Sequence, residues 1–244
     1  MTNRAMATAA ATLTAGWTVL DYARWRALGP GGLPSTPRGW LIMSALRIRA
    51  WRVDPFDTTG WSGSGHLTGP LPMRPGSRPT VARYPVPHRQ LDQHPDPQFA
   101  SGLTIASFVA ARPTLACRRS FFEEHIDAAF AAPGSPIHAD GQVSGGEIGH
   151  IHADGSLHVV LAPADAAQCI DSRWGELHPL SGRAMGLPGQ YVLLYAPREP
   201  TEVTTIERLL DAAAKHMTAD QPSATLRPEG NRDEPRRFQH NHRF

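Results

Sequence analysis

The stretch EIGHIHADGSLHVVL, residues 147–161, predicts a β-hairpin. Residues 148–152 and 157–161 are two short runs of apolar residues and histidines, and Ala-Asp-Gly at 153–155 separates the two runs. Runs of this kind around a glycine-containing turn are typical of two antiparallel strands. We expect a three-residue turn with Gly155 in its third position, where the backbone needs a positive φ that glycine adopts without strain.

The length of this turn decides which side chains share a face of the hairpin. A three-residue turn places His150 opposite His158 and His152 opposite Ser156, whereas a two-residue turn would move His158 to the apolar face. We prefer the first register because it keeps the apolar residues together. The histidine face then carries Ile148, His150, His152, Ser156, His158 and Val160, and the apolar face carries Ile151, Leu157, Val159 and Leu161.

Three imidazoles on one face of a sheet are a candidate catalytic or metal site. With a carboxylate nearby, from Glu147 or Asp154, they match the ligands of zinc, iron or copper. They equally suit proton transfer without a metal, because histidine titrates near neutral pH. The plain structural alternative is a polar face whose histidines are hydrogen-bonded to their neighbours. His178 adds a further imidazole in a segment where loops commonly line sites.

The patterns around the hairpin predict an α+β fold, with a mostly antiparallel sheet and helices packed on one face. Pro163 begins a helix that continues through residue 170, and residues 191–195 form a buried strand. Thr201 caps a final helix with one apolar stripe. Before the hairpin, aromatic and aliphatic residues near helical spacing predict a helix over 120–132.

We expect three segments along the chain. Residues 1–53 form an N-terminal helical segment that contacts a membrane or packs on the domain, and no apolar run reaches the ~18–20 residues of a membrane span. The tryptophans and arginines of 39–52 favour reversible, peripheral contact, and removing residues 1–28 should leave the histidine site intact. Residues 54–218 form the α+β domain, which begins with a long Gly/Pro-rich segment. Residues 219–244 form a disordered basic tail.

Composition excludes several classes of function. The chain has 244 residues and a net charge of +2, which argues against a dedicated nucleic-acid binder. Two cysteines cannot form a disulfide framework or a cysteine zinc site. The glycines at 60, 63 and 65 do not follow a strand, and neither a G-x-S-x-G nor an H-E-x-x-H motif occurs. Nucleotide binding and serine hydrolysis are therefore poor candidates.

Around the histidines the sequence resembles the fungal luciferase family, whose members oxidise 3-hydroxyhispidin. The resemblance is carried by EIGHIH at 147–152, LH at 157–158, WGELHPLSG at 174–182, LYAPR at 194–198 and MTAD at 217–220. Weaker matches at 21–22, 29–30, 38–39 and 74–79 extend it over most of residues 21–220. The loop before His158 is shorter than in the family by an even number of residues, and the N-terminal segment is less hydrophobic than the family's anchoring helix. The high arginine content favours a bacterial relative.

The resemblance implies an oxygenase that adds O2 to an enolisable pyrone such as 3-hydroxyhispidin, releases CO2 and emits light. It implies no cofactor beyond O2, whereas the three-histidine geometry leaves open a non-haem metal ion held by His150, His152 and His158. The expected catalytic residues are His150, His152, His158, His178 and Glu147. The expected substrate-binding residues are Arg78, Trp174, Tyr195 and Arg198, although Tyr195 equally suits a core strand.

The expected partners are an aromatic or pyrone small molecule and O2, without nucleic acid and with peripheral membrane contact through the N-terminus. The expected location is the cytoplasm, with part of the protein on a membrane surface. The alternative function is a non-catalytic module that binds a small ligand or a metal in the same histidine-lined pocket.

Overall fold

The computed structural model describes residues 2–96, 102 and 104–219. Apart from Ala219, the predicted basic tail lies outside the described residues. The helices are α1 (Thr2–Ala27), α2 (Pro37–Ala50), α4 (Ile105–Ala110), α5 (Pro163–Asp171) and α6 (Pro200–Met217), with a short 3-10 helix η1 (Ala139–Gly141). The strands are β1 (Leu115–Arg119), β2 (Asp127–Ala131), β3 (Glu147–Ile151), β4 (Leu157–Val160), β5 (Gly175–Leu177) and β6 (Tyr191–Leu194).

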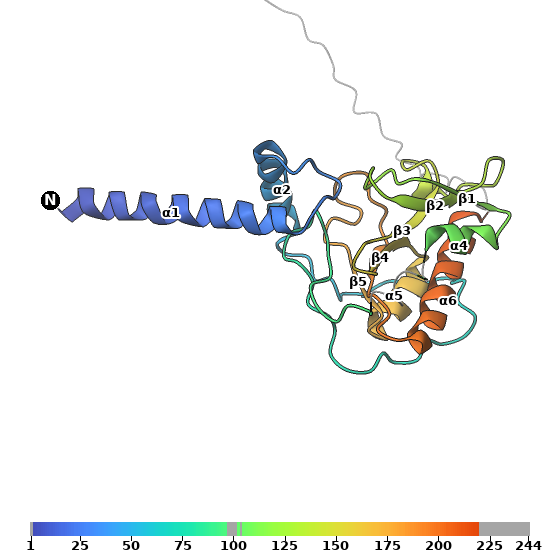
Figure 1. The fold of residues 1–244 in the computed structure, drawn as a ribbon. Coiled ribbons are helices and arrows are strands. Elements are labelled where there is room, and N and C mark those ends of the chain that lie inside the picture. The colour runs from blue at the N-terminus through green and yellow to red at the C-terminus, as the bar shows by residue number, and fades with distance from the viewer. Residues whose placement is uncertain (1, 97–101, 103, 220–244) are drawn as a thin grey trace, which may run out of the picture.

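The six strands form one antiparallel sheet in the order β1-β2-β3-β4-β6-β5. Helices α4, α5 and α6 pack against it and bury a continuous apolar cluster (Figure 1). The apolar side chains of β4 enter this cluster together with those of α6, as the alternation of the strand requires. The predicted α+β fold with N-terminal helices is confirmed.

The hairpin has the predicted register. His150 pairs with His158, and the backbone N–H of His152 donates to the Ser156 carbonyl. Gly155, the third residue of the turn, has a φ of 84°, in the region that glycine adopts without strain. The side chain of Asp154 accepts hydrogen bonds from the backbone and the hydroxyl of Ser156, which fixes the turn.

One residue of the hairpin lies on the opposite face from the one predicted. Phe130 of β2 pairs with Glu147 while Ala129 pairs with Gly149, so Ile148 is an extra residue in β3 and forms a bulge. The bulge turns Glu147 onto the histidine face and leaves Ile148 fully buried in the apolar cluster. It therefore brings a carboxylate next to the histidines.

The prediction of a helix over residues 120–132 is wrong. This segment contains a turn followed by β2, which pairs with β1 on one side and β3 on the other. The hydroxyl of Ser120 accepts the backbone N–H groups of Phe122 and Glu123, which holds the turn. Pairing on both edges outweighs the helical propensity of the alanines in this segment.

Two smaller expectations about the C-terminal part also need correction. Residues 175–177, expected as loop, form the edge strand β5. Helix α6 begins at Pro200, and the hydroxyl of Thr201 donates to the Glu199 carboxylate instead of capping the helix. The apolar stripe of α6 is as predicted, with its buried residues on the sheet side.

Helix α1 projects from the rest of the molecule and packs on it only near its C-terminal end (Figure 1). Trp25 is buried against Met43 and Tyr84, and its indole N–H donates to the Val86 carbonyl. Asp21 accepts hydrogen bonds from Arg47 and from other side chains around it. Within the described part of the chain, no helix is long and apolar enough to cross a membrane.

Candidate functional site

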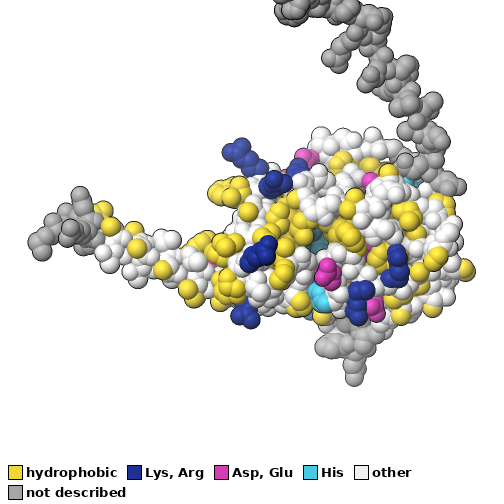
Figure 2. Space-filling view, turned by 90° about the horizontal axis from the view of Figure 1, so that it is seen from above, with side chains coloured by type: hydrophobic (Ala, Val, Ile, Leu, Met, Phe, Trp, Pro, Cys, Tyr) yellow, Lys and Arg dark blue, Asp and Glu magenta, His cyan; other side chains and the backbone are white. Residues whose placement is uncertain are grey.

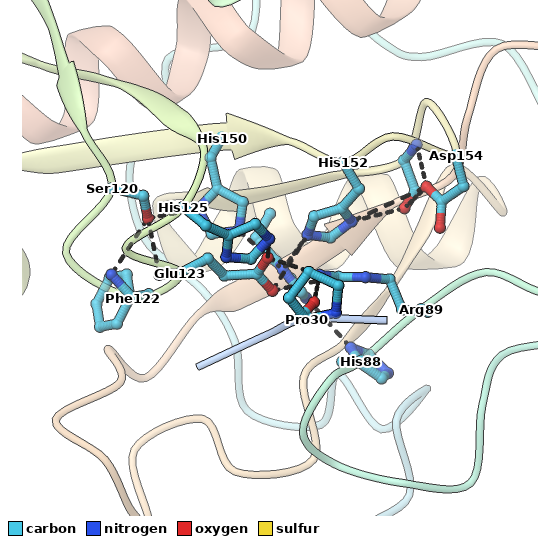
Figure 3. Close-up of polar contacts among 12 residues, drawn as sticks. Pro30, His88, Arg89, Ser120, Phe122, Glu123, His125, His150, His152 and Asp154 are labelled. Atoms are coloured by element: carbon cyan, nitrogen blue, oxygen red, sulfur yellow. Dashed lines mark hydrogen bonds and ion pairs between the residues drawn. The ribbon is translucent and has the colours of Figure 1, made fainter. Parts of the chain in front are cut away.

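His150 of β3, His152 just after it and His158 of β4 meet on the sheet face opposite the packed helices. Figure 3 shows His150 and His152 side by side. The Nδ1 atom of His158 lies 3.1 Å from Nε2 of His152 and 3.4 Å from Nε2 of His150. All three side chains are buried, so they form an internal cluster and not an exposed polar surface. We call His150, His152 and His158 the histidine triad.

Each triad imidazole is also held by a side chain outside the cluster. The pairs are His150 Nδ1 with Glu147 Oε1 at 2.7 Å, His152 Nδ1 with Ser156 Oγ at 2.8 Å, and His158 Nε2 with His88 Nδ1 at 3.3 Å. Such outer contacts fix the orientation and tautomer of a functional histidine. The second nitrogen of each ring is thereby directed at the other two histidines.

Glu147 is buried and fully engaged. Besides His150, its carboxylate accepts the hydroxyl of Ser120 at 2.9 Å and the backbone N–H of Phe121 at 2.6 Å. These contacts tie the turn after β1 to the triad, and the bulge of β3 accounts for the position of Glu147 beside the histidines.

A second carboxylate, that of Glu123, approaches the triad from the same turn. Arg89 donates to both of its oxygens, at 2.7 Å and 2.6 Å, and also donates to the Pro30 carbonyl (Figure 3). The Oε1 atom of Glu123 lies 3.8 Å from Nε2 of His152. Arg89 therefore fixes an anionic oxygen at the edge of the triad.

His88 extends the hydrogen-bonded network toward β5 and β6. Its Nε2 lies 3.3 Å from Oε1 of Glu176, whose other oxygen accepts the hydroxyl of Tyr195 at 2.8 Å. The ring of His88 stacks on that of His158 with centroids 5.5 Å apart. Tyr195, predicted to bind substrate, thus reaches the triad only through Glu176 and His88.

His178 and Tyr191 border the triad on its β6 side. The Nδ1 atom of His178 accepts the backbone N–H of Leu180, and its other nitrogen donates to the Pro85 carbonyl. The ring of Tyr191 stacks on His158 at 4.9 Å. Among the described residues, no side chain or backbone atom hydrogen-bonds the buried Tyr191 hydroxyl, which leaves it free for a ligand.

The electrostatic environment keeps these groups neutral near pH 7. Burial lowers the pKa of His152 well below its ordinary value, and the nearby charge of Arg89 lowers it further. Burial and the neighbouring imidazoles do the same to the pKa of His158, and burial and His88 to that of His178. Burial, together with the carboxylates of Glu147 and Glu123, raises the pKa of Tyr191. The phenol therefore remains a hydrogen-bond donor.

An inner cavity borders His158 of the triad, and an outer cavity adjoins the inner one. The inner one has about 30 Å³, enough for dioxygen or a few waters. It is lined by His88, His158, His178, Tyr191 and Glu123, among others. The outer one has about 600 Å³ and is lined by residues 30–35 and by Phe121, Phe122, Glu124, His125 and Met185. The two share Gly32, Phe122 and Met185, so they adjoin.

The other residues predicted to bind substrate do not line these two cavities. Arg78 donates to the backbone carbonyls of residues 170 and 175, and Trp174 donates to that of residue 72. Arg198 pairs with Glu202. The structure thus brings together His150, His152, His158, His178 and Glu147, and gives Arg78, Trp174 and Arg198 backbone or ion-pair contacts elsewhere.

Several residues of the site were not predicted. His88 and Arg89 lie in the Gly/Pro-rich segment, and Ser120 and Glu123 lie in the turn that was expected to be a helix. Tyr191 and Glu176 share the histidine face through the pairing of β4, β6 and β5. The strand alternation of 191–195 could have indicated Tyr191 if the pairing of β4 with β6 had been known.

A comparison with known protein families finds a match in the part of the chain that contains the site. The Luciferase domain family model matches residues 145–213, which contain the triad, Glu147, His178 and Tyr191. A luciferase of Armillaria gallica is 29% identical over 92% of this chain and 92% of its own length. The chain is a relative of the fungal luciferases.

Other fungal luciferases show the same level of similarity. That of Armillaria mellea is 29% identical over 84% of both chains, and that of Neonothopanus nambi is 28% identical over 82% of this chain and 81% of its own. No solved structure matches significantly. These relatives support a luciferase-like function, which at the coarse level is that of an oxygen-using oxidoreductase.

Proposed function

We propose that the chain oxidises an enolisable hydroxypyrone, such as 3-hydroxyhispidin, with O2 in the cavities beside the histidine triad. The observation that carries the proposal is a cluster of three buried imidazoles, one of which, His158, lines the small inner cavity that adjoins an outer cavity large enough for such a ligand. The similarity to fungal luciferases supports the same class of reaction.

The cavities suit a planar aromatic ligand with one reactive end. Ligand pockets of about 300–1,000 Å³ hold drug-sized molecules, and the outer cavity of 600 Å³ falls within this range. Phe121, Phe122 and Met185 offer apolar contacts to an aromatic tail. The pyrone ring would then face the inner cavity, where the hydroxyl of Tyr191 can donate to a developing enolate oxygen.

The reaction requires that the substrate lose its enol proton. Either a basic group or a bound cation that stabilises the enolate can promote this loss. The nitrogens of the triad are suited to both roles. O2 then adds to the electron-rich ring, and the ring–oxygen adduct loses one carbon as CO2. The small volume of the inner cavity limits the water that would otherwise intercept this adduct.

Oxygen uptake tests the proposal directly. We expect O2 consumption and stoichiometric CO2 release when the purified chain is mixed with 3-hydroxyhispidin or simpler hydroxypyrones, with light recorded in parallel. Uptake at the background rate, together with saturable binding of the same compounds, would replace the enzyme with a non-catalytic binding module.

The first prediction concerns the unpaired hydroxyl of Tyr191. We expect Tyr191→Phe to lower kcat about 10- to 100-fold, because one donor to the enolate is lost. Stability should remain or rise, since a buried hydroxyl without a partner costs free energy. Steady-state O2 uptake and thermal unfolding measure the two effects. A fall in unfolding temperature with unchanged kcat would show that the hydroxyl has only a structural role.

We also propose that α1 and α2 contact a membrane surface peripherally. Their exposed apolar side chains include Leu13, Trp17, Leu41, Ile48 and Trp51. Figure 2 shows hydrophobic side chains along this part of the molecule with basic side chains around them. An apolar surface with arginines nearby is typical of segments that lie on anionic lipid.

A truncated chain should lose membrane binding without losing its folded structure. Removal of residues 1–28, which the sequence suggested, would also remove Trp25 and its bond to the segment that carries His88. We therefore expect removal of residues 1–20, which takes away the exposed Leu13, Trp17 and Leu20, to keep the unfolding temperature and to weaken binding to anionic vesicles at least about tenfold. Vesicle sedimentation at low and high salt measures this. Equal binding by both forms would contradict the contact.

A further inference from the structure

The hydrogen atoms of the triad can be assigned from its outer partners. A carboxylate accepts hydrogen bonds but does not donate them, so Nδ1 of His150 carries the proton that Glu147 accepts. The Nε2 atom of His150, which faces the other histidines, therefore presents a lone pair.

The same reasoning applies to His152. The hydroxyl of Ser156 donates to Asp154 at 2.5 Å, so it must accept from Nδ1 of His152. The Nε2 atom of His152 is then unprotonated, and it also faces the centre of the triad.

The protonated nitrogen of His158 follows from two successive hydrogen bonds. Glu176 accepts the proton on Nε2 of His88, which leaves Nδ1 of His88 as an acceptor. That atom accepts the proton on Nε2 of His158 at 3.3 Å. The Nδ1 atom of His158 therefore also carries a lone pair, which is directed at His150 and His152.

Three lone pairs thus converge, and no hydrogen lies among them. Water supplies two hydrogens, one too few for three nitrogens, whereas a metal ion can accept all three lone pairs. With metal–nitrogen bonds of 2.0–2.1 Å, tetrahedral ligands lie about 3.3 Å apart. The separations of 3.1 Å and 3.4 Å within the triad match this spacing.

We propose that His150, His152 and His158 bind one divalent transition-metal ion, with Glu123 as a fourth ligand. One ligand atom from each of the four residues lies within 4.8 Å of the others, and all four residues are buried. Arg89 orients the Glu123 carboxylate, and Glu147, Ser156 and His88 orient the imidazoles, as outer partners do in metal sites. Imidazole and carboxylate ligands suit zinc, iron, copper or nickel.

A second cluster in the described chain does not show this convergence. Between His138 and His216 lies the carboxylate of Asp140, 3.2 Å from a nitrogen of the former and 2.9 Å from one of the latter. The Nδ1 atom of His138 accepts the backbone N–H of Asp140, and the Asp140 carboxylate accepts from Nε2 of His216, so hydrogen bonds within the cluster engage both of these nitrogens. It offers a matched control for the triad.

The role of the ion rests on the function proposed above, whereas its binding does not. Next to the inner cavity, a cation would stabilise the enolate of the substrate. Loss of metal binding and loss of oxygenase activity are therefore separate outcomes, and each can be measured without the other.

Metal titration tests the proposal. We expect the purified full-length chain to contain one transition-metal ion, and the chelator-treated chain to take up one equivalent of Zn²⁺ or Co²⁺, with Co²⁺ giving visible ligand-field absorption. His152→Gln should weaken Zn²⁺ binding at least about 100-fold, and Glu147→Gln, which keeps all four ligands, about 10- to 100-fold. Near-ultraviolet circular dichroism verifies that each variant is folded.

His216→Gln is the matched control and should leave both stoichiometry and affinity unchanged. A folded wild-type chain that takes up no Zn²⁺ or Co²⁺ would overturn the proposal, as would loss of the ion in His216→Gln but not in His152→Gln. O2 uptake by protein shown to be free of metal would overturn the role of the ion in the reaction while leaving the proposed function standing. Metal uptake without O2 consumption would support the site and contradict the function.

Discussion

Replacement of any one of His150, His152 and His158 by glutamine or alanine is expected to lower kcat for O2 uptake at least about 100-fold. The Nε2 atoms of His150 and His152 both lie within 3.4 Å of Nδ1 of His158, so loss of one imidazole disturbs the position of the other two. Steady-state O2 uptake with a hydroxypyrone measures the effect.

The losses should also be non-additive. Groups that act as a unit lose nearly all of their effect when one is removed, so a double variant should be scarcely slower than either single variant. His138→Gln, in the separate cluster with Asp140 and His216, should change kcat by less than about threefold. Small and additive losses at the three positions would instead favour histidines with only a structural role.

These variants also have a cost in stability. The triad is buried, so alanine at position 150 leaves the Glu147 carboxylate without one of its partners. An unpaired buried group costs about 1–3 kcal/mol, which a domain with about 5–15 kcal/mol of stability can tolerate. Glutamine variants and an unfolding curve therefore accompany each activity measurement.

The hairpin at the centre of the site was predictable because its signals are local. The two-residue alternation, the length of the turn and Gly155 together determine the register that places His150 opposite His158. His178 and Glu147 were predicted as site residues because they lie close in sequence to the segments that the hairpin and the family resemblance singled out. The bulge at Ile148 could not be foreseen, because it arises from the pairing of β3 with β2, which was expected to be a helix.

His88 and Glu123 were missed for a different reason. Both lie in irregular segments whose positions depend on distant contacts, and sequence periodicity carries no information about these. The indole N–H of Trp25 donates to the carbonyl of Val86, and the Gln90 side chain accepts the backbone N–H of Ala196. These contacts place His88 over the triad, so half of the network around the imidazoles comes from outside the predicted elements.

The second large effect is expected from Glu202→Leu. Glu202 and Arg74 form an ion pair with 4% and 2% of their side chains exposed, and the Arg74 guanidinium also lies near the rings of Trp174 and Tyr195. Removing one partner of a buried pair leaves an uncompensated charge and costs about 3–5 kcal/mol. For a chain of this size, we expect the unfolding temperature to fall by roughly 6–20 °C.

Acid should remove the same stabilisation from the wild-type chain. Burial alone would raise the pKa of Glu202, but hydrogen bonds from Arg198 and Arg74 hold it below its ordinary value of 4.5. A lowered pKa gives a contribution that is complete above the unfolded value and is lost as the pH falls through the folded one. The difference in stability between wild type and Glu202→Leu should therefore narrow below pH 4.5.

A double variant separates the effect of the unpaired charge on stability from the effect of the cavity that Glu202→Leu leaves. Arg74→Met combined with Glu202→Leu removes both charges, and apolar replacement of a buried ion pair is often neutral or stabilising. We expect it to recover most of the loss, because Arg198, with 29% of its side chain exposed, can turn to solvent. Asp211→Ala, which breaks the exposed pair with Arg112, should cost less than about 1 kcal/mol. A similar small cost for Glu202→Leu in urea unfolding would mean that the Arg74–Glu202 pair does not hold the Gly/Pro-rich segment against α6.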